Sequence, residues 1–284
     1  MSLTLVQAWT AARKRLEGAG VDGPVIDARL LVEAAADATR VDIIADPQRL
    51  LTEDQEATLE AYVARRERRE PVSHILGRKG FWKIMVRVTA DVLTPRPDTE
   101  TLVDLVLKAF PEGRVFSLLD LGVGSGAIIL AILAERPGGK GLGVDVSEEA
   151  LAVARENAAN LGLAGRVALL RGDWTQGLGE ASFDLVVANP PYIPTDDIAG
   201  LQPEVSAYEP RLALDGGPDG LDAYRLLAPE ILRVVKPGGR FFVEIGFDQS
   251  EAVEGLFKAA GAAQVATVKD LANRDRVVMG VRPA

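Results

Sequence analysis

From residue 114 onward, the sequence alternates between apolar runs typical of strands and patterns typical of helices. Strands are expected at residues 115–121, 142–144, 167–170, 183–188 and 240–245. Helices are expected at residues 127–135, 148–161, 224–235 and 249–260. This alternation predicts an α/β fold with a doubly wound, mostly parallel sheet. No helical pattern separates the last two strands, 265–268 and 277–281, so we expect them to pair antiparallel at an edge.

The N-terminal part of the chain has a different character, because helical patterns follow one another there without a strand signal. Thr52 and Gln55 have the spacing of a capping box, in which each side chain satisfies the other's backbone donor at the start of a helix. The charged run at residues 65–70 is expected to be a solvated helix face. We therefore predict a small helical bundle at residues 1–71.

Pro71 ends the helical pattern, and β-forming residues follow it between glycines. Residues 72–95 are predicted to form a linking β-hairpin, and residues 96–284 a second, larger domain. Within that domain a loop rich in Pro, Asp and Gly is expected at residues 193–221.

Composition excludes several kinds of chemistry. The chain of 284 residues has no Cys, which excludes disulfides, thiolate nucleophiles and Cys-ligated metals. Its one His argues against a His-rich metal site, so no metal site is expected. A net charge of −9 and a pI near 4.9 make it a poor candidate for binding duplex DNA. The N-terminus lacks the pattern of a secretory signal, and no apolar run approaches the about 20 residues that span a bilayer. A cytoplasmic protein without a membrane partner is expected.

A glycine-rich turn at residues 122–126 lies between the first expected strand of the sheet and the helix after it. Its G-x-G-x-G spacing is not the G-x-G-x-x-G that places a pyrophosphate on a helix N-terminus. Asp145 ends the next strand, where it can accept hydrogen bonds from ribose hydroxyls. Asp173 ends the third strand and can accept from an adenine amine, while Trp174 offers a stacking face. Each acid alone could be an exposed carboxylate or a helix cap, but the three features together indicate a nucleoside pocket that fits S-adenosylmethionine.

A tetrad, Asn189-Pro190-Pro191-Tyr192, follows the apolar run 183–188. Prolines fix φ and lack a donor, so the tetrad predicts a stiff turn at the end of a strand. Ligands of open α/β sheets bind outside the carboxyl ends of the strands, where this tetrad could hold a planar amide or base. A turn that only stops the strand explains the tetrad alone equally well.

Together, residues 120–126, Asp145 and Asp173 resemble the class I S-adenosylmethionine-dependent methyltransferases, which have a Rossmann-like, mostly parallel seven-stranded sheet. The tetrad resembles that of the subset that methylates planar nitrogens. Four further segments resemble the HemK/PrmC family, and they lie at residues 95–100, 209–211, 214–221 and 269–271. Members of this family methylate the glutamine of the Gly-Gly-Gln motif in peptide chain release factors. One departure is His74, where the family leads us to expect a Tyr in the hairpin.

The resemblance implies a role for each motif residue. The turn residues that approach the cofactor would be Gly122, Val123, Gly124, Ser125 and Gly126. Asp145 would bind ribose, and Asp173 and Trp174 would frame adenine. Asn189 would contact the cofactor, and it would also hold the substrate glutamine together with Pro190, Pro191 and Tyr192. The N-terminal bundle would help to recognise the release factor.

The chemistry implied by this family needs alignment more than a base, because the methyl group of a sulfonium is already activated. The side-chain oxygen of Asn189 and the carbonyl of Pro190 could accept the two N–H bonds of the substrate amide, with Tyr192 packed on its plane.

Three rival functions are considered. A nucleic-acid exocyclic-amine methyltransferase uses the same tetrad, but the acidic pI and the HemK-like segments disfavour it, so no direct nucleic-acid partner is expected. A non-catalytic adenosyl-binding or release-factor-binding module has no need of the tetrad. A nicotinamide dehydrogenase is disfavoured by the glycine spacing.

Overall fold

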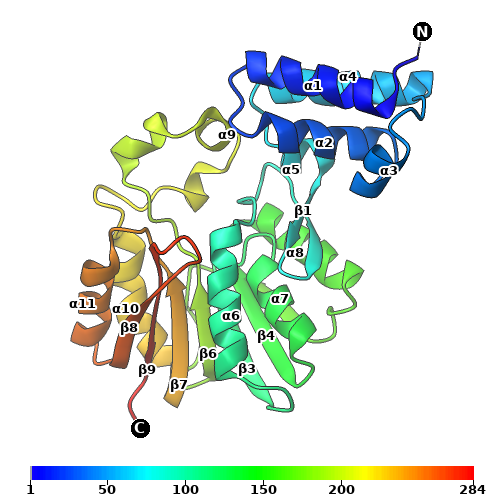
Figure 1. Cartoon of the computed structure of the whole chain (residues 1–284). Helices are drawn as coiled ribbons and strands as arrows, with labels where there is room; N and C mark the ends of the chain where they lie inside the picture. The colour runs from blue at the N-terminus through cyan, green and yellow to red at the C-terminus, as the bar shows by residue number, and fades with distance from the viewer. Residues whose placement is uncertain (1) are drawn as a thin grey trace. The chain divides into compact units, whose positions relative to one another are not determined.

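The computed structural model describes residues 2–284, which form two compact units (Figure 1). The first, here called the helical unit, comprises Met1–Gly77 and Gln202–Tyr208. The second, here called the sheet unit, comprises Arg78–Leu201 and Glu209–Ala284. A short segment from the second half of the sequence thus packs with the N-terminal helices, which the sequence patterns did not indicate.

The helical unit is built on an apolar core in which Leu5, Leu16 and Leu31 are fully buried. Its helices are α1 (Leu5–Gly18), α2 (Pro24–Ala35), α3 (Arg40–Ala45), α4 (Glu53–Glu67), α5 (Val72–Leu76) and α9 (Pro203–Ser206). The expected capping box is confirmed, because Thr52 accepts from the backbone N–H of Gln55 and the Gln55 side chain accepts from that of Thr52. His74 lies in α5 rather than in the hairpin, so its expected place in the hairpin was wrong.

The charged run at residues 65–70, at the end of α4, is not a wholly solvated face, which corrects that expectation. Arg66 is only 5% exposed, and its guanidinium bonds Asp27 at 2.8 Å and Glu204 at 2.7 Å. Arg69 donates hydrogen bonds to both carboxylate oxygens of the same Glu204, at 2.6 and 2.8 Å. Arg66 and Arg69 of this run therefore point into the helical unit, where they bond Glu204 from a distant part of the sequence.

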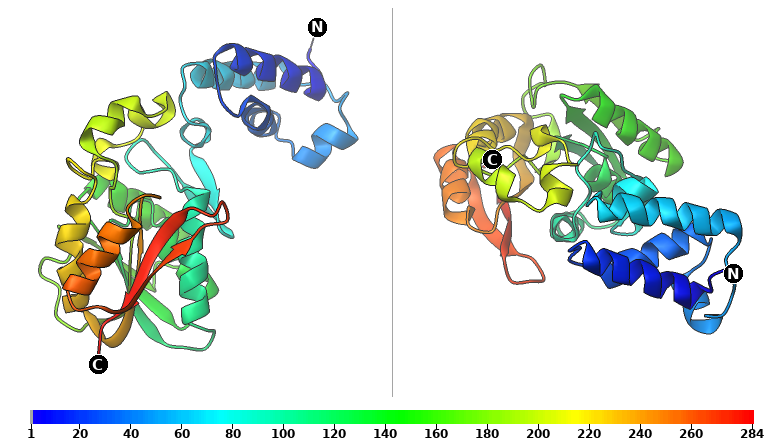
Figure 2. Two further views of the ribbon diagram at one scale, coloured as in Figure 1. Left: turned by 60° about the vertical axis from the view of Figure 1, so that its left-hand side comes forward. Right: turned by 90° about the horizontal axis from the view of Figure 1, so that it is seen from above.

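The sheet unit contains a seven-stranded sheet in the order β5-β4-β3-β6-β7-β9-β8. Its strands are β3 (Phe116–Leu121), β4 (Gly139–Asp145), β5 (Val167–Arg171), β6 (Phe183–Ala188), β7 (Val235–Glu244), β8 (Ala263–Lys269) and β9 (Asp275–Val281). The first five in the sheet order are parallel, whereas β9 is antiparallel to both neighbours. The two C-terminal strands, β9 and β8, drawn in orange to red, form one edge of the sheet (Figure 2, left). The predicted mostly parallel sheet with an antiparallel edge is confirmed.

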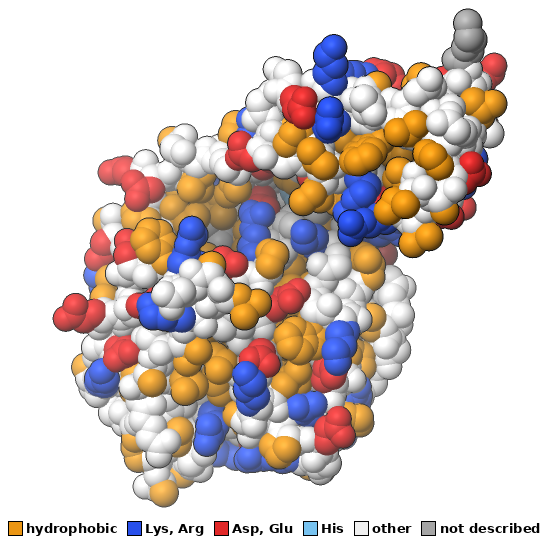
Figure 3. Space-filling model, viewed as in Figure 1, with side chains coloured by type: hydrophobic (Ala, Val, Ile, Leu, Met, Phe, Trp, Pro, Cys, Tyr) orange, Lys and Arg blue, Asp and Glu red, His pale blue; other side chains and the backbone are white. Residues whose placement is uncertain are grey.

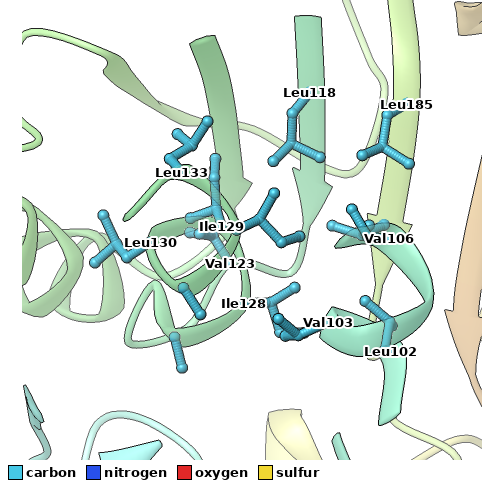
Figure 4. Close-up of a cluster of buried hydrophobic side chains, with 14 of the residues drawn as sticks. Leu102, Val103, Val106, Leu118, Val123, Ile128, Ile129, Leu130, Leu133 and Leu185 are labelled. Carbon is cyan, nitrogen blue, oxygen red and sulfur yellow. The ribbon is translucent and has the colours of Figure 1, made fainter. Parts of the chain in front are cut away.

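Helices cover both faces of this sheet. One face carries α6 (Glu100–Ala109), α7 (Ala127–Glu135) and α8 (Glu148–Asn160), and the other carries α10 (Asp222–Val234) and α11 (Ser250–Ala259). Alternate strand residues serve the two faces: Leu118 of β3 packs with the first group, shown in Figure 4, and Leu119 with the second. Burial of β3 on both faces explains why apolar residues on this strand are not confined to alternate positions.

Smaller elements complete the sheet unit. Strands β1 (Arg78–Phe81) and β2 (Ile84–Arg87) form an antiparallel hairpin, which confirms a hairpin in this region. The expected loop at 193–221 contains 3-10 turns at Thr195–Gly200 and Arg211–Ala213 in addition to α9. A further 3-10 turn at Pro97–Thr99 precedes α6.

The strand register brings several strand ends to one place. Leu121 of β3 lies opposite Val144 of β4 and Ala188 of β6. Ala188 in turn lies opposite Val243 of β7. The residues that follow these positions therefore leave the sheet side by side at its carboxyl edge.

Candidate active site

A cavity of about 570 Å³ opens at the carboxyl edge of the sheet. Most of the predicted site residues line it: Gly122, Val123, Gly124, Ser125, Asp145, Asp173, Trp174, Asn189 and Pro191. Gly126, Pro190 and Tyr192 are not among its lining residues. The cavity thus joins the glycine turn and the tetrad, which lie more than 60 residues apart in sequence, in one enclosure of a size usual for a cofactor site.

The glycine turn has the backbone that its composition predicts. Gly122, Gly124 and Gly126 all have positive φ, at 72°, 52° and 80°, a region that L-residues with a Cβ rarely enter. A Cβ on Gly126 would also lie 3.0 Å from the Leu130 side chain. Gly126 therefore permits the turn and the packing of α7, whereas Gly122 and Gly124 face the cavity.

Asp145 both orders the turn and faces the cavity. Its Oδ2 accepts from the backbone N–H of Gly124 at 2.9 Å, and its Oδ1 accepts from that of Ser147 at 3.0 Å. A carboxylate oxygen has two lone pairs, so each oxygen keeps acceptor capacity for another donor. This fits a ligand with two neighbouring hydroxyls, such as a ribose.

Trp174 packs close to the same turn. A Cβ on Gly122 would lie 3.5 Å from the indole ring, so glycine allows the turn and the ring to approach each other. Asp173 is exposed, and its Oδ2 accepts from the side-chain amide of Gln176 at 2.7 Å. The pair offers a flat surface and a nearby carboxylate, which fits a purine ring with an exocyclic amine.

The tetrad begins with a half-buried Asn189, whose side-chain Nδ2 donates to Oγ1 of Thr99 at 3.4 Å. Tyr192 packs against the buried cluster beneath α10 and α11, and its backbone oxygen accepts from the Gln249 side chain at 3.0 Å. Burial raises the pKa of Tyr192 to about 12, so its hydroxyl stays protonated at neutral pH. The tetrad is anchored at this end.

The glycine-rich segment 214–221 lies directly against the tetrad. A Cβ on Gly220 would lie 2.3 Å from the backbone oxygen of Tyr192, and one on Gly216 would lie 2.8 Å from the Tyr192 Cα. Ile193 and the segment exchange backbone hydrogen bonds, to Leu214 at 3.0 Å and from Gly216 at 2.9 Å. Glycines are required here because two backbones meet.

Arg96 supplies positive charge to an otherwise acidic cavity. Among the described lining residues it is the one cation, beside Asp91, Asp145, Glu149, Asp173 and Asp215. Its guanidinium bonds Oε2 of Glu209 at 2.8 Å, and the Glu209 side chain is only 1% exposed. Burial raises the pKa of Glu209, and Arg96 opposes that shift. This charge balance favours a ligand with net positive charge, such as a sulfonium bearing an amino-acid group.

Sequence reasoning missed several residues at this edge. Segment 90–93 and Phe81 of β1 line the cavity, but neither belongs to a recognisable sequence motif. Asp120, to which the 120–126 motif assigned no role, is 1% exposed and accepts from the Ile129 N–H at 3.2 Å, and burial raises its pKa well above the ordinary value. Glu244 is equally buried at the end of β7, beside the tetrad. Its position at a strand end is the same signal that identified Asp145.

The fold and the cavity define an S-adenosylmethionine-dependent methyltransferase. Two family models match the chain, a PrmC N-terminal domain over residues 7–77 and a methyltransferase domain over residues 115–272. The chain belongs to the release factor glutamine methyltransferase family, which confirms the resemblance to HemK/PrmC.

The curated relatives match over nearly the whole chain. A release factor glutamine methyltransferase from Caulobacter vibrioides is 70% identical over 99% of this chain and 98% of its own length. One from Rhodospirillum rubrum is 46% identical over 95% of this chain and 82% of its own length. The crystal structure of a methyltransferase from Pyrococcus furiosus covers 70% of this chain and 89% of its own, with a TM-score of 0.52 and 18% identity, which shows the shared fold.

Membrane insertion has no support in the helices. Among residues 2–284, every helix is too short or too polar to cross a bilayer.

Proposed function

We propose that this chain transfers a methyl group from S-adenosylmethionine to the side-chain amide nitrogen of the glutamine in the Gly-Gly-Gln motif of peptide chain release factors, and so modulates translation termination. One observation carries the proposal: a single cavity is lined by both the glycine turn with Asp145 and by Asn189 of the tetrad. A donor held by the first would present its methyl group toward an amide held by the second. Release factors as substrates imply an enzyme of the cytoplasm.

The cofactor would be held by Gly122, Gly124, Asp145 and the Asp173-Trp174 pair. The lone pairs that remain on Asp145 suit the ribose hydroxyls, and Trp174 suits the adenine face. Val123 and Ser125 complete the turn, and Gly126 acts through the turn's shape rather than by contact.

The side-chain amide of the substrate glutamine would be held by the tetrad. An amide nitrogen is a poor nucleophile because its lone pair is delocalised into the carbonyl. The Asn189 side-chain oxygen and the Pro190 carbonyl would accept the two N–H bonds, which favours a pyramidal nitrogen with its lone pair facing the donor. When bound, S-adenosylmethionine supplies an activated methyl group, so the residues need to align the nitrogen and let its proton pass to water.

Pro191 and Tyr192 would act differently from one another. Pro191 lines the cavity and can contact the substrate amide, whereas Tyr192 anchors the tetrad through the buried cluster and Gln249. A direct contact between the Tyr192 ring and the glutamine stays a prediction from the family resemblance.

The helical unit would recognise the release factor. It exposes large apolar side chains, among them Val25, Ile26, Val41, Ile44 and Leu50, and orange atoms gather on its surface in Figure 3. Exposed apolar patches of this kind commonly mark protein-binding surfaces.

A nucleic-acid substrate is the weaker alternative. The visible face of the sheet unit mixes Lys and Arg with Asp and Glu (Figure 3), and the net charge is −9. Phosphate backbones are bound through concentrated positive charge, which neither the face in Figure 3 nor the net charge favours.

The test is incubation of the protein with methyl-labelled S-adenosylmethionine and either a release factor or DNA, followed by mapping of the label by mass spectrometry. The proposal expects label on the glutamine of Gly-Gly-Gln and none on a release factor in which that glutamine is replaced by alanine. Label on DNA only, or on neither substrate, would overturn it.

A further inference from the structure

Glu244 is a buried acid that the mechanism above does not use. It ends β7, is 1% exposed, and its Oε2 has no hydrogen-bond partner among the described residues. A buried polar atom without a partner is costly, so such a group is commonly retained for function. Because Glu244 lies beside the tetrad, its function is expected to concern Asn189.

The sheet register places Glu244 next to Asn189. Ala188 and Val243 lie opposite each other in the parallel pair β6 and β7, so the residues that follow them leave the sheet together. Thr99, 3% exposed, lies at the same point at the start of α6. Nδ2 of Asn189 donates to Oγ1 of Thr99 at 3.4 Å, and the polar groups of Thr99 and Asn189 both lower the pKa of the Glu244 carboxyl. The three side chains therefore form one polar cluster, in which Thr99 and Glu244 are buried and Asn189 borders the cavity.

The cluster fixes which way the Asn189 amide faces. That amide has two N–H donors and one oxygen acceptor, and an ionised carboxylate can only accept. Nδ2 of Asn189 already donates to Thr99 at 3.4 Å, so its second N–H is the group that suits Glu244. With both donors held on this side, Oδ1 is left for the cavity.

We propose that Glu244 is a positioning residue that orients the Asn189 amide so that its oxygen faces the substrate glutamine. The inference rests on the proposed role of Asn189 as the acceptor for the substrate amide. Without a carboxylate at this position, the Asn189 amide could turn over and present a donor to the substrate N–H, which would repel it.

Charged groups around Glu244 make this orientation sensitive to pH. The groups that face it are Asp98 from the turn before α6, Arg276 of β9, and the hydroxyls of Tyr192 and Tyr224. Burial raises the pKa of Glu244 to about 7 and Asp98 adds to the shift, while Thr99, Arg276 and Asn189 oppose it. Because the ionised form is the one that only accepts, the correctly oriented fraction rises as pH rises through about 7.

Two variants test the proposal in the full-length enzyme with a release factor as substrate and saturating S-adenosylmethionine. Glu244→Leu removes the acceptor, and kcat should fall by about a hundredfold while the dissociation constant for S-adenosylmethionine is unchanged. Glu244→Gln keeps one acceptor oxygen but cannot ionise. Its activity should stay within about tenfold of the parent at pH 8, and the rise in kcat near pH 7 should vanish.

A double-mutant cycle with Asn189→Ala separates positioning from general stability. If Glu244 acts through Asn189, adding Glu244→Leu to Asn189→Ala should cause little further loss in single-turnover rate. Equal loss in both backgrounds, or a pH profile of Glu244→Gln that matches the parent, would overturn the inference. Should Glu244→Leu not fold, the pH profile of Glu244→Gln decides alone. Near-normal turnover of Asn189→Ala would instead refute the proposed role of Asn189, and with it this inference.

Discussion

At the scale of single residues, the site depends on acceptors whose other hydrogen bonds are already fixed. Asp145 is held by the backbone N–H groups of Gly124 and Ser147 before any ligand arrives. The amide of Asn189 is held from its other end, because its Nδ2 donates to Oγ1 of Thr99. Acceptors positioned in advance lose little conformational entropy when a ligand binds.

Asp145→Ala should weaken the binding of S-adenosylmethionine by about a hundredfold, because it removes two charge-assisted hydrogen bonds to ribose. Isothermal titration calorimetry measures this directly. Asp54→Ala, which changes an exposed acid in the first turn of α4, is the matched control and should bind like the parent. Unchanged affinity in Asp145→Ala would show that the ribose role is wrong.

At the scale of elements, the glycine-rich segment 214–221 supports the tetrad by backbone contact. Such a contact leaves no room for a side chain at Gly216 or Gly220. The segment also joins Ile193, directly after the tetrad, through backbone hydrogen bonds. It therefore sets the position of the tetrad without itself providing a reactive group.

Gly220→Ala should lower both stability and activity. Its φ is 75° and the new Cβ would lie 2.3 Å from the Tyr192 oxygen, so strain and overlap together should cost about 2 to 4 kcal/mol of unfolding free energy. Urea unfolding measures this, and kcat should fall because the tetrad moves. Gly165→Ala, where no atom lies within 4 Å of the new Cβ, is the control. Equal stability of the two variants would contradict the contact described here.

At the scale of the whole molecule, the chain leaves the sheet unit after Leu201, joins the helical unit through Gln202–Tyr208, and returns at Glu209. Glu204 holds this segment by its bonds to Arg66 and Arg69. Burial would raise the pKa of Glu204, but hydrogen bonds from Arg69 and Arg66 outweigh burial and lower it to about 2. The helical unit thus includes a part of the loop that follows the tetrad.

Glu204→Gln should loosen this segment. Loss of the charged bonds should lower the free energy of unfolding by about 2 kcal/mol. The buried Arg66 would keep Asp27 as its remaining acidic partner. Amide hydrogen exchange at residues 202–208 should therefore become faster at pH 7, while exchange in the sheet core is unchanged. Glu251→Gln, at an exposed glutamate in the first turn of α11, is the control. Unaltered exchange at 202–208 would show that Glu204 does not hold the segment.

The contribution of Glu204 to the free energy of unfolding should decrease as the pH falls. The pKa of Glu204 is lowered in the folded state, so its stabilisation is complete above the unfolded value of about 4.5 and is lost as pH falls toward 2. In Glu204→Gln that part of the acid-induced loss of stability should be absent, as measured by urea unfolding between pH 7 and pH 3.

The sequence predicted the parts of the molecule whose signals are local. Buried parallel strands read as apolar runs, so the sheet followed, and polar residues at strand ends gave Asp145, Asp173 and Asn189. The bond between Arg66 and Glu204 joins residues 138 apart, and a charged helix end carries no sign of such a partner. Arg96 was marked only as part of the family-like segment 95–100, because only the folded chain brings it to the cavity.

The central claim is that Asn189 aligns the substrate glutamine and contributes little to the affinity for the methyl donor. It is tested most directly by measuring Asn189→Ala in two assays, calorimetric binding of S-adenosylmethionine and methyl transfer to a release factor. The account predicts donor affinity close to that of the parent and transfer slower by about a hundredfold or more. Near-normal transfer, or a loss of transfer explained entirely by weaker donor binding, would contradict it.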